Sequence, residues 1–172
     1  MIELLISMTM LNVGILALVA AFNSGGVALQ RAGRISTASA LADQQMELFR
    51  AVTYPNIFLD TGAESTARAD STYACDTALT SCSAGVAQVT ATCTALPGES
   101  GEPPPRCNPT RTLLGPDQHK YRLDTYIVLQ YPTGSASTSR QNKLITVVVR
   151  DGLNLTRVLG RETSTFDSAT GS

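Results

Sequence analysis

The residues of this sequence with the most evident chemistry are four cysteines grouped in the middle of the chain: Cys75, Cys82, Cys93 and Cys107. Zinc-binding cysteines usually occur as closely spaced pairs, often with histidines nearby. Here there is no C-x-x-C pair, and the single histidine, His119, lies outside the cysteine segment. We therefore expect two disulfides and no metal site. Sequential pairing, Cys75–Cys82 and Cys93–Cys107, closes the shortest loops.

Side chains suited to catalysis are scarce. His119 stands alone between Gln118 and Lys120, and we expect it to be a solvated surface residue. The sequence has neither a G-x-S-x-G motif nor a second histidine for a catalytic triad. Gly25-Gly26 lacks the preceding strand and the further glycines of a phosphate-binding loop. The sequence therefore predicts no enzymatic activity and no cofactor.

The composition and the charge of the sequence limit the kinds of protein that it can encode. The 172 residues carry a formal net charge of -1, without a basic stripe to attract nucleic acid. Charged residues make up 16% of the chain, below the usual ~25%. Serine, threonine, alanine and glycine take the place of the missing charged residues, as in many exported bacterial domains. The length suits one domain and an anchor helix.

One carboxylate stands at the edge of a membrane-length apolar stretch. Glu3 lies within residues 1–22, and the next charge is Arg31. As a helix this stretch spans roughly 33 Å, enough to cross a bilayer core. It lacks the basic n-region and the cleavage site of a signal peptide, so we expect an uncleaved anchor. A buried carboxylate favours a cation, and no lysine or arginine lies within helical reach. The partner must come from another chain or from the N-terminus.

The run Ile2-Glu3-Leu4-Leu5 before an apolar helix resembles the mature N-terminus of type IV pilins and type II secretion pseudopilins. In that family a prepilin peptidase cuts after a glycine and the new N-terminal residue is methylated. Met1-Ile2-Glu3 matches the third to fifth mature residues, so the leader and the first two mature residues are expected upstream. The resemblance implies assembly through Glu3, Ile2, Leu4 and Leu5. It also implies that the Glu3 carboxylate pairs with the N-terminal amine of a neighbouring subunit.

A second apolar pattern follows at helical spacing: Ile35, Ala38, Ala42, Met46, Phe49 and Val52. It ends before Tyr54-Pro55, because proline disfavours helix at the residue before it. We predict one helix over about residues 2–53, with 1–26 as the membrane or filament-core half and 27–53 as the amphipathic half. We expect it to be loosened near Gly25-Gly26, since each glycine costs about 1 kcal/mol relative to alanine. The resemblance implies melting there during assembly, and a tolerated kink is the alternative.

Residues 54–172 are predicted to form a globular domain. We expect an irregular connector over 56–70 and a disulfide loop over 71–110, with a short strand around 86–94 and a proline-rich loop over 97–109. Because large apolar residues are few in 71–110, we expect its disulfides on the exposed face of the domain.

The C-terminal third predicts an antiparallel sheet over about residues 120–166. Its strands are expected at 121–131, 143–150 and 156–166, the last at an edge. Their short connections indicate a meander, with one apolar face packed on the helix stripe. The expected fold class is α+β, a long N-terminal helix on a C-terminal antiparallel sheet, as in pilins.

Together these patterns predict a structural, minor subunit of a type IV pilus or a type II secretion pseudopilus. The expected partners are other pilin or pseudopilin subunits, the prepilin peptidase, the inner-membrane assembly platform and the membrane, crossed once. Disulfides favour an extracytoplasmic domain, whereas Arg31 and Arg34 directly after the apolar helix favour the opposite orientation. The alternative is a single-pass membrane-anchored extracytoplasmic binding module, whose helix serves only as a tether.

Overall fold

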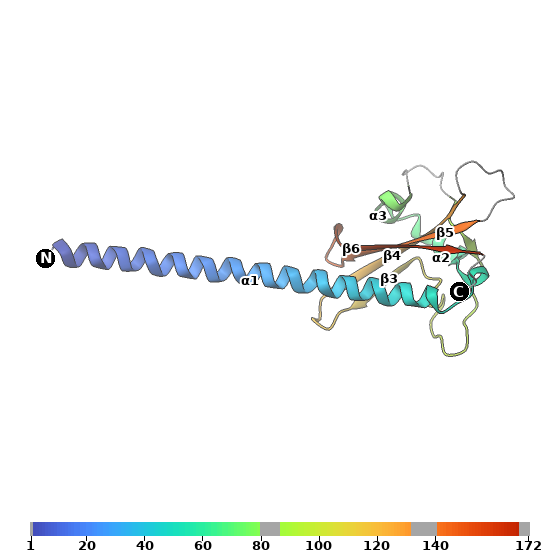
Figure 1. Cartoon of the computed structure of the whole chain (residues 1–172), viewed down its shortest axis with the longest axis horizontal. Helices are drawn as coiled ribbons and strands as arrows, with labels where there is room; N and C mark the ends of the chain where they lie inside the picture. The colour runs from blue at the N-terminus through green and yellow to red at the C-terminus, as the bar shows by residue number, and fades with distance from the viewer. Residues whose placement is uncertain (1, 80–86, 132–140, 169–172) are drawn as a thin grey trace. The chain divides into compact units, whose positions relative to one another are not determined.

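The computed structural model describes residues 2–79, 87–131 and 141–168. The chain divides into two compact units, Met1–Ser36 and Thr37–Ser172. Helix α1 (Ile2–Arg50) supplies the first unit and continues into the second, which holds the remaining elements (Figure 1). The architecture is α+β, as predicted: a long apolar N-terminal helix and a C-terminal antiparallel sheet.

Helix α1 is unbroken where loosening was expected. Residues 23–26 are helical, so the two glycines are absorbed within the longer helix. The helix ends at Arg50 rather than at 53. The N–H of Val52 bonds the carbonyl of Phe49, three residues back, and Thr53 is extended, with φ -71° and ψ 152°. The chain therefore leaves the helix before the Tyr54-Pro55 pair.

The predicted apolar stripe is only partly buried. Its four central positions belong to the main core: Ala38, Ala42, Met46 and Phe49. Val52 is partly buried against that core. Ile35 falls in the N-terminal unit and is 41% exposed, so it does not take the packing role expected of it. One helix position that the pattern missed, Gln45, is fully buried.

The main sheet has four strands in the order β3-β4-β5-β6, one more than predicted, and all neighbours are antiparallel. The strands are β3 (Thr110–Leu114), β4 (Lys120–Gln130), β5 (Asn142–Asp151) and β6 (Asn154–Asp167). Strand β3 was not predicted from the sequence. The placement of β6 at an edge is confirmed.

One glycine, Gly152, lets a turn approach the sheet closely. Gly152 lies in the β5–β6 turn, and its N–H donates to the carbonyl of Lys120 at 2.8 Å. A Cβ there would come within 2.7 Å of that carbonyl oxygen. Gly160 of β6 faces Ala38 of α1, and a Cβ at this position would make ordinary van der Waals contact with the helix backbone at 3.7 Å.

The connector over 56–70 is not irregular, because it contains helix α2 (Thr61–Ala67). The other short elements are η1 (Tyr54–Asn56), β1 (Leu59–Asp60), α3 (Ser71–Ala74), η2 (Thr77–Leu79) and β2 (Thr90–Ala91). The Asp60 carboxylate accepts the N–H of Ala63 and caps α2. The strand expected around 86–94 corresponds to β2, which pairs with β1 in parallel.

Apolar clusters form on both faces of the sheet. The main cluster joins α1 to one face through Leu123, Ile127, Ile145 and Val147. A second cluster joins Tyr73 and Leu79 to Tyr126 and Val148. Adjacent residues along β5, Val147 and Val148, are therefore both buried, although their side chains point to opposite faces. The expectation of a single apolar face was incomplete.

Candidate functional site

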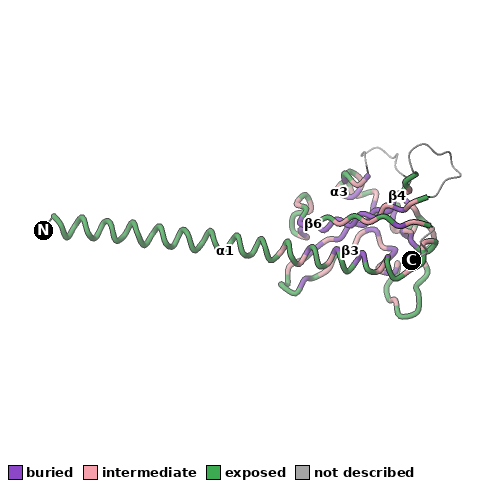
Figure 2. The backbone as a smooth tube through the Cα atoms, in the orientation of Figure 1, coloured by how far each residue is buried: buried purple, intermediate pink, exposed green. Residues whose placement is uncertain are grey.

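The N-terminal half of α1 exposes an apolar surface on every side. All residues from 2 to 33 are exposed, including large apolar side chains such as Ile2, Leu4 and Leu5 at 73%, 72% and 65% (Figure 2). In the described ranges α1 is the one helix long and apolar enough to cross a membrane. Its apolar window has a mean hydropathy of 2.2, and none of it is buried. A surface of this kind needs lipid or other apolar helices around it.

Glu3 is the one charged residue before Arg31, and it differs from two hydroxyl groups of this half-helix. The hydroxyl of Thr9 donates to the Ile6 carbonyl at 2.8 Å, and the hydroxyl of Ser24 donates to the Ala21 carbonyl at 2.9 Å. These hydroxyls are satisfied within the helix and can enter an apolar environment cheaply. In the part of the chain that the structure describes, Glu3 has no hydrogen bond or ion pair. Ile2, Glu3, Leu4 and Leu5 are thus placed together by the helix, and their role in assembly stays a prediction.

The middle of the chain is organised by the Cys93–Cys107 disulfide, which is present as expected. Cys75 also takes part in a disulfide, and its expected partner, Cys82, lies outside the described residues. The expectation that these bonds lie on the exposed face is wrong for Cys107, which is fully buried. Its carbonyl accepts the N–H of Asp60 at 2.8 Å, so the bonded loop packs against β1.

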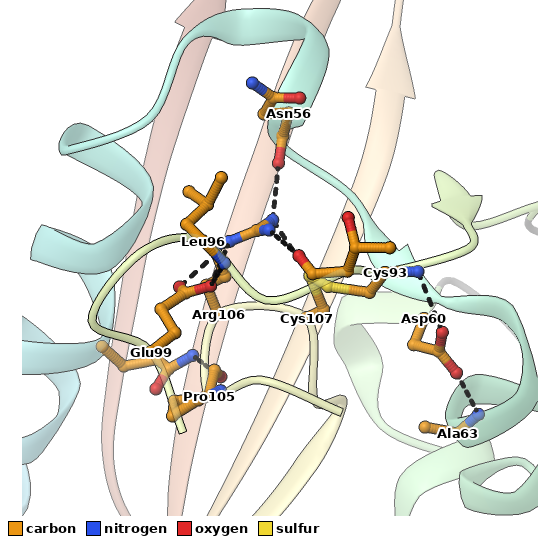
Figure 3. Close-up of a disulfide and its surroundings, with 11 residues drawn as sticks. Asn56, Asp60, Ala63, Cys93, Leu96, Glu99, Pro105, Arg106 and Cys107 are labelled. Atoms are coloured by element: carbon orange, nitrogen blue, oxygen red, sulfur yellow. Dashed lines mark hydrogen bonds and ion pairs between the residues drawn. A yellow bond between two sulfur atoms is a disulfide. The ribbon is translucent and has the colours of Figure 1, made fainter. Parts of the chain in front are cut away.

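Arg106 explains why a loop with few large apolar residues is ordered. Its side chain is 4% exposed and points into the loop that the disulfide closes (Figure 3). It donates to the Thr94 carbonyl at 2.9 Å and to the Asn56 carbonyl at 3.3 Å, and it pairs with Glu99 at 3.0 Å. The loop therefore has a polar interior, which a search for apolar residues cannot find.

His119 is not the solvated residue that we expected. Its side chain is 10% exposed, and Nε2 lies 2.8 Å from the Asp151 carboxylate. The ring meets that of Tyr121 edge to face at 5.2 Å. The contact ties the β3–β4 turn to the β5–β6 turn, which adjoin because of the Gly152–Lys120 bond.

The sheet face opposite α1 carries a continuous ionic chain. It alternates carboxylates and guanidinium groups: Asp70, Arg122, Asp124, Arg150, Asp76 and Arg161. Asp124 is fully buried and accepts from Arg122 and Arg150 at 2.8 Å each. Burial raises the pKa of Asp124, and the two guanidinium groups oppose that shift. The chain attaches the segment containing α3 and η2 to the sheet.

The charged groups of this ionic chain are already paired within the protein, so the ionic chain does not offer a ligand site. A cavity of about 530 Å³ lies beside it and is lined by Asp60, Asp70 and Arg122 among others. Each of these charges already has partners in the protein: Asp60 binds the N–H groups of Ala63 and Cys93, and Asp70 binds Arg122. Within the described ranges, no three histidine, cysteine or acidic side chains gather as a metal site.

Comparisons with protein-family models, with curated proteins and with solved structures find no match. The most unusual feature of the described residues is the exposed apolar half of α1, in which the Glu3 carboxylate has no partner among them.

Proposed function

We propose that the protein is a minor structural subunit of a type IV pilus or a type II secretion pseudopilus, with no enzymatic activity of its own. The observation that carries the proposal is Glu3, which has no partner among the described residues and lies in the first turn of a half-helix that is apolar and exposed on every side. Before assembly this half crosses the bacterial inner membrane once, and the disulfide-bearing unit lies outside the cytoplasm. Prepilin peptidase and the assembly platform are its expected partners there.

Assembly gives Glu3 a specific task. When the apolar half-helix packs among helices of other subunits, a carboxylate without a cation is strongly unfavourable. The pilin resemblance supplies that cation as the N-terminal amine of a neighbouring subunit. An ion pair of this kind gives a fixed axial register to helices that otherwise present only apolar side chains.

A substitution at Glu3 tests the proposal. Glu3→Ala, made in the full gene in its bacterial host, is expected to remove the protein from sheared filaments while its level in the membrane is unchanged. Glu3→Gln is expected to fail in the same way, because the amide keeps the size of the side chain but not its charge. Immunoblots of the sheared and membrane fractions measure both quantities.

The control is Glu102→Ala, which removes a carboxylate from an exposed loop position and should leave assembly unchanged. If Glu3→Ala reaches sheared filaments at the parental level, the helix is only a tether and the membrane-anchored binding module is the better function. Quantitative proteomics of the same filaments tests the minor role, which would be wrong if this chain were the dominant subunit.

A further inference from the structure

A groove lies within the second unit, between α1 and β3, and its lining combines leucines with the polar side chains of Gln44, Gln45 and Arg111. Its volume is about 340 Å³. Its walls are leucines from α1, β3 and β4: Leu41, Leu48, Leu113, Leu114 and Leu123. It exists because β3 is an edge strand of the sheet and α1 covers it incompletely. Leu114 is accordingly 64% exposed, whereas Leu123 at the groove floor is 2% exposed.

One cation, Arg111 of β3, lines this groove. Its Nη1 donates to the Gln45 side-chain oxygen at 2.9 Å, and within the described ranges it has no carboxylate partner. Arg122 and Arg150, on the other face of the sheet, each hold two carboxylates. Burial lowers the pKa of Arg111, with no acidic group acting against that shift. The groove therefore contains a partly desolvated positive charge that has no counterion in the part of the chain that the structure describes.

The position of this guanidinium is fixed by a buried side chain. Gln45 is 1% exposed, and its amide N–H donates to the Pro105 carbonyl at 3.0 Å. That bond turns the amide oxygen toward Arg111. Pro105 in turn belongs to the loop closed by Cys93–Cys107. Gln45 and Pro105, which are 60 residues apart in sequence, thus hold one cation at the side of a groove that contains several leucines.

We propose that this groove binds an apolar chain that ends in a carboxylate, of the medium-chain fatty acid class. Its volume falls in the range of small-molecule pockets, which are mostly apolar with few placed polar groups. The leucines would take the methylene chain, and Arg111 would pair with the carboxylate through charge-assisted hydrogen bonds. Esterified lipids and alcohols lack that anion and fit less well. This proposal does not depend on filament assembly.

Photoaffinity labelling of the full chain in phosphatidylcholine nanodiscs tests the proposal. The probe is a decanoate analogue that carries a diazirine in its chain, and mass spectrometry locates the crosslinks. We expect crosslinks in residues 41–48 and 111–114. Unlabelled decanoate should compete at a concentration about tenfold lower than decanol, as expected for one charge-assisted contact. Crosslinks elsewhere only, or equal competition by decanol, would overturn the proposal, and a groove reserved for another protein would give the first of these results.

Variants of Arg111 separate recognition from general partitioning into the bilayer. Arg111→Gln should abolish the preference for decanoate over decanol, and Arg111→Lys should keep part of it. The matched control is Arg157→Gln, which removes an arginine of β6 that has no ion partner among the described residues and does not line the groove. Because the preference is a ratio within each variant, differences in protein yield cancel. A full preference in Arg111→Gln would contradict the assignment.

Discussion

The two faces of the sheet are covered in different ways. Toward α1 the contacts are apolar: Met46 and Phe49 pack on Ile145, Val147 and neighbouring side chains. The other face has a small apolar cluster beside the alternating ionic chain from Asp70 to Arg161. The apolar face depends on volume and shape, which many side chains satisfy. The ionic face depends on matched charges and hydrogen bonds, which few side chains satisfy.

The register of the strands shows why the ionic face tolerates few substitutions. Arg122 of β4 and Arg150 of β5 are directly paired across the strands. Like charges in such a position are unfavourable. Asp124 compensates by lying between them and binding both, while Asp70 and Asp76 hold their outer sides. Removing an inner member therefore leaves its neighbours with buried charges that have lost one of their two partners.

The largest expected effect is at Arg150. Arg150→Leu should destabilise the protein by about 3–5 kcal/mol, because Asp124 and Asp76 lose a buried partner. Arg150→Lys should also be strongly destabilising, since one ammonium group cannot reproduce contacts to two carboxylates and the Leu155 carbonyl. Thermal unfolding of the full chain in detergent, followed by circular dichroism, measures both changes.

The matched change on the other face is Met46→Leu, a volume-conserving substitution that should cost less than about 1.5 kcal/mol. If Arg150→Lys destabilises the protein no more than Met46→Leu does, the two faces do not differ in their tolerance of substitution. In that case the ionic chain would be a surface feature that water readily replaces.

An intermediate effect is expected from removing the Cys93–Cys107 bond. A disulfide that closes a loop of this length contributes about 3 kcal/mol in the chain-entropy model. The double substitution Cys93→Ser, Cys107→Ser should loosen the loop, β1 and the start of α2, because Asp60 binds both Cys93 and Cys107. Hydrogen exchange should rise at Asp60 and Ala63 but not at Ile145. Loss of protection throughout the sheet would show that the disulfide also supports the helix-covered face.

The helix-covered face could be predicted from the sequence more fully than the ionic face. Helical spacing identifies Ala38, Ala42, Met46 and Phe49, since every third or fourth apolar residue shares a face. The edge strand β3 was missed because Thr110–Leu114 is short and its inward residues, Arg111 and Leu113, give no clear apolar alternation. The apolar run in β5 reflects burial on both faces, which a single-face interpretation overlooks.

The ionic chain could not be predicted, because its members lie far apart in sequence. Arg150 and Asp76 are 74 residues apart, and Arg122 and Asp70 are 52 apart. Only the fold brings them together. The sequence does contain a local signal for the two short helices α2 and α3. Asp60 and Asp70 each precede one of these helices and cap it. Reading these two residues as N-caps would have placed α2 within the connector over 56–70 and α3 at the start of the loop over 71–110. Nothing in the spacing of Arg111, Gln45 and Pro105 indicates the groove.

The smallest expected effect concerns the pH dependence of two carboxylates. The N–H of Ala63, and after it that of Cys93, hold the pKa of Asp60 below its ordinary value of 3.8. Such a group stabilises the folded state above that value, and the contribution is lost as the pH falls through the folded-state pKa. Burial instead raises the pKa of Asp124. Its contribution has the opposite sign, because the folded state gains stability as the pH falls through the raised pKa.

Asp60→Asn tests this difference, because asparagine keeps an acceptor for the Ala63 N–H and loses both the charge and the acceptor for the Cys93 N–H. The variant should be less stable than the wild type by at most about 1 kcal/mol at neutral pH, and the gap should close as the pH falls below 3.8. Unfolding free energies across this range measure the gap, and carboxyl NMR titration should place Asp60 below 3.8 and Asp124 above it. A gap that stays constant with pH would mean that the Asp60 charge does not contribute. The cap would then act through its hydrogen bonds alone.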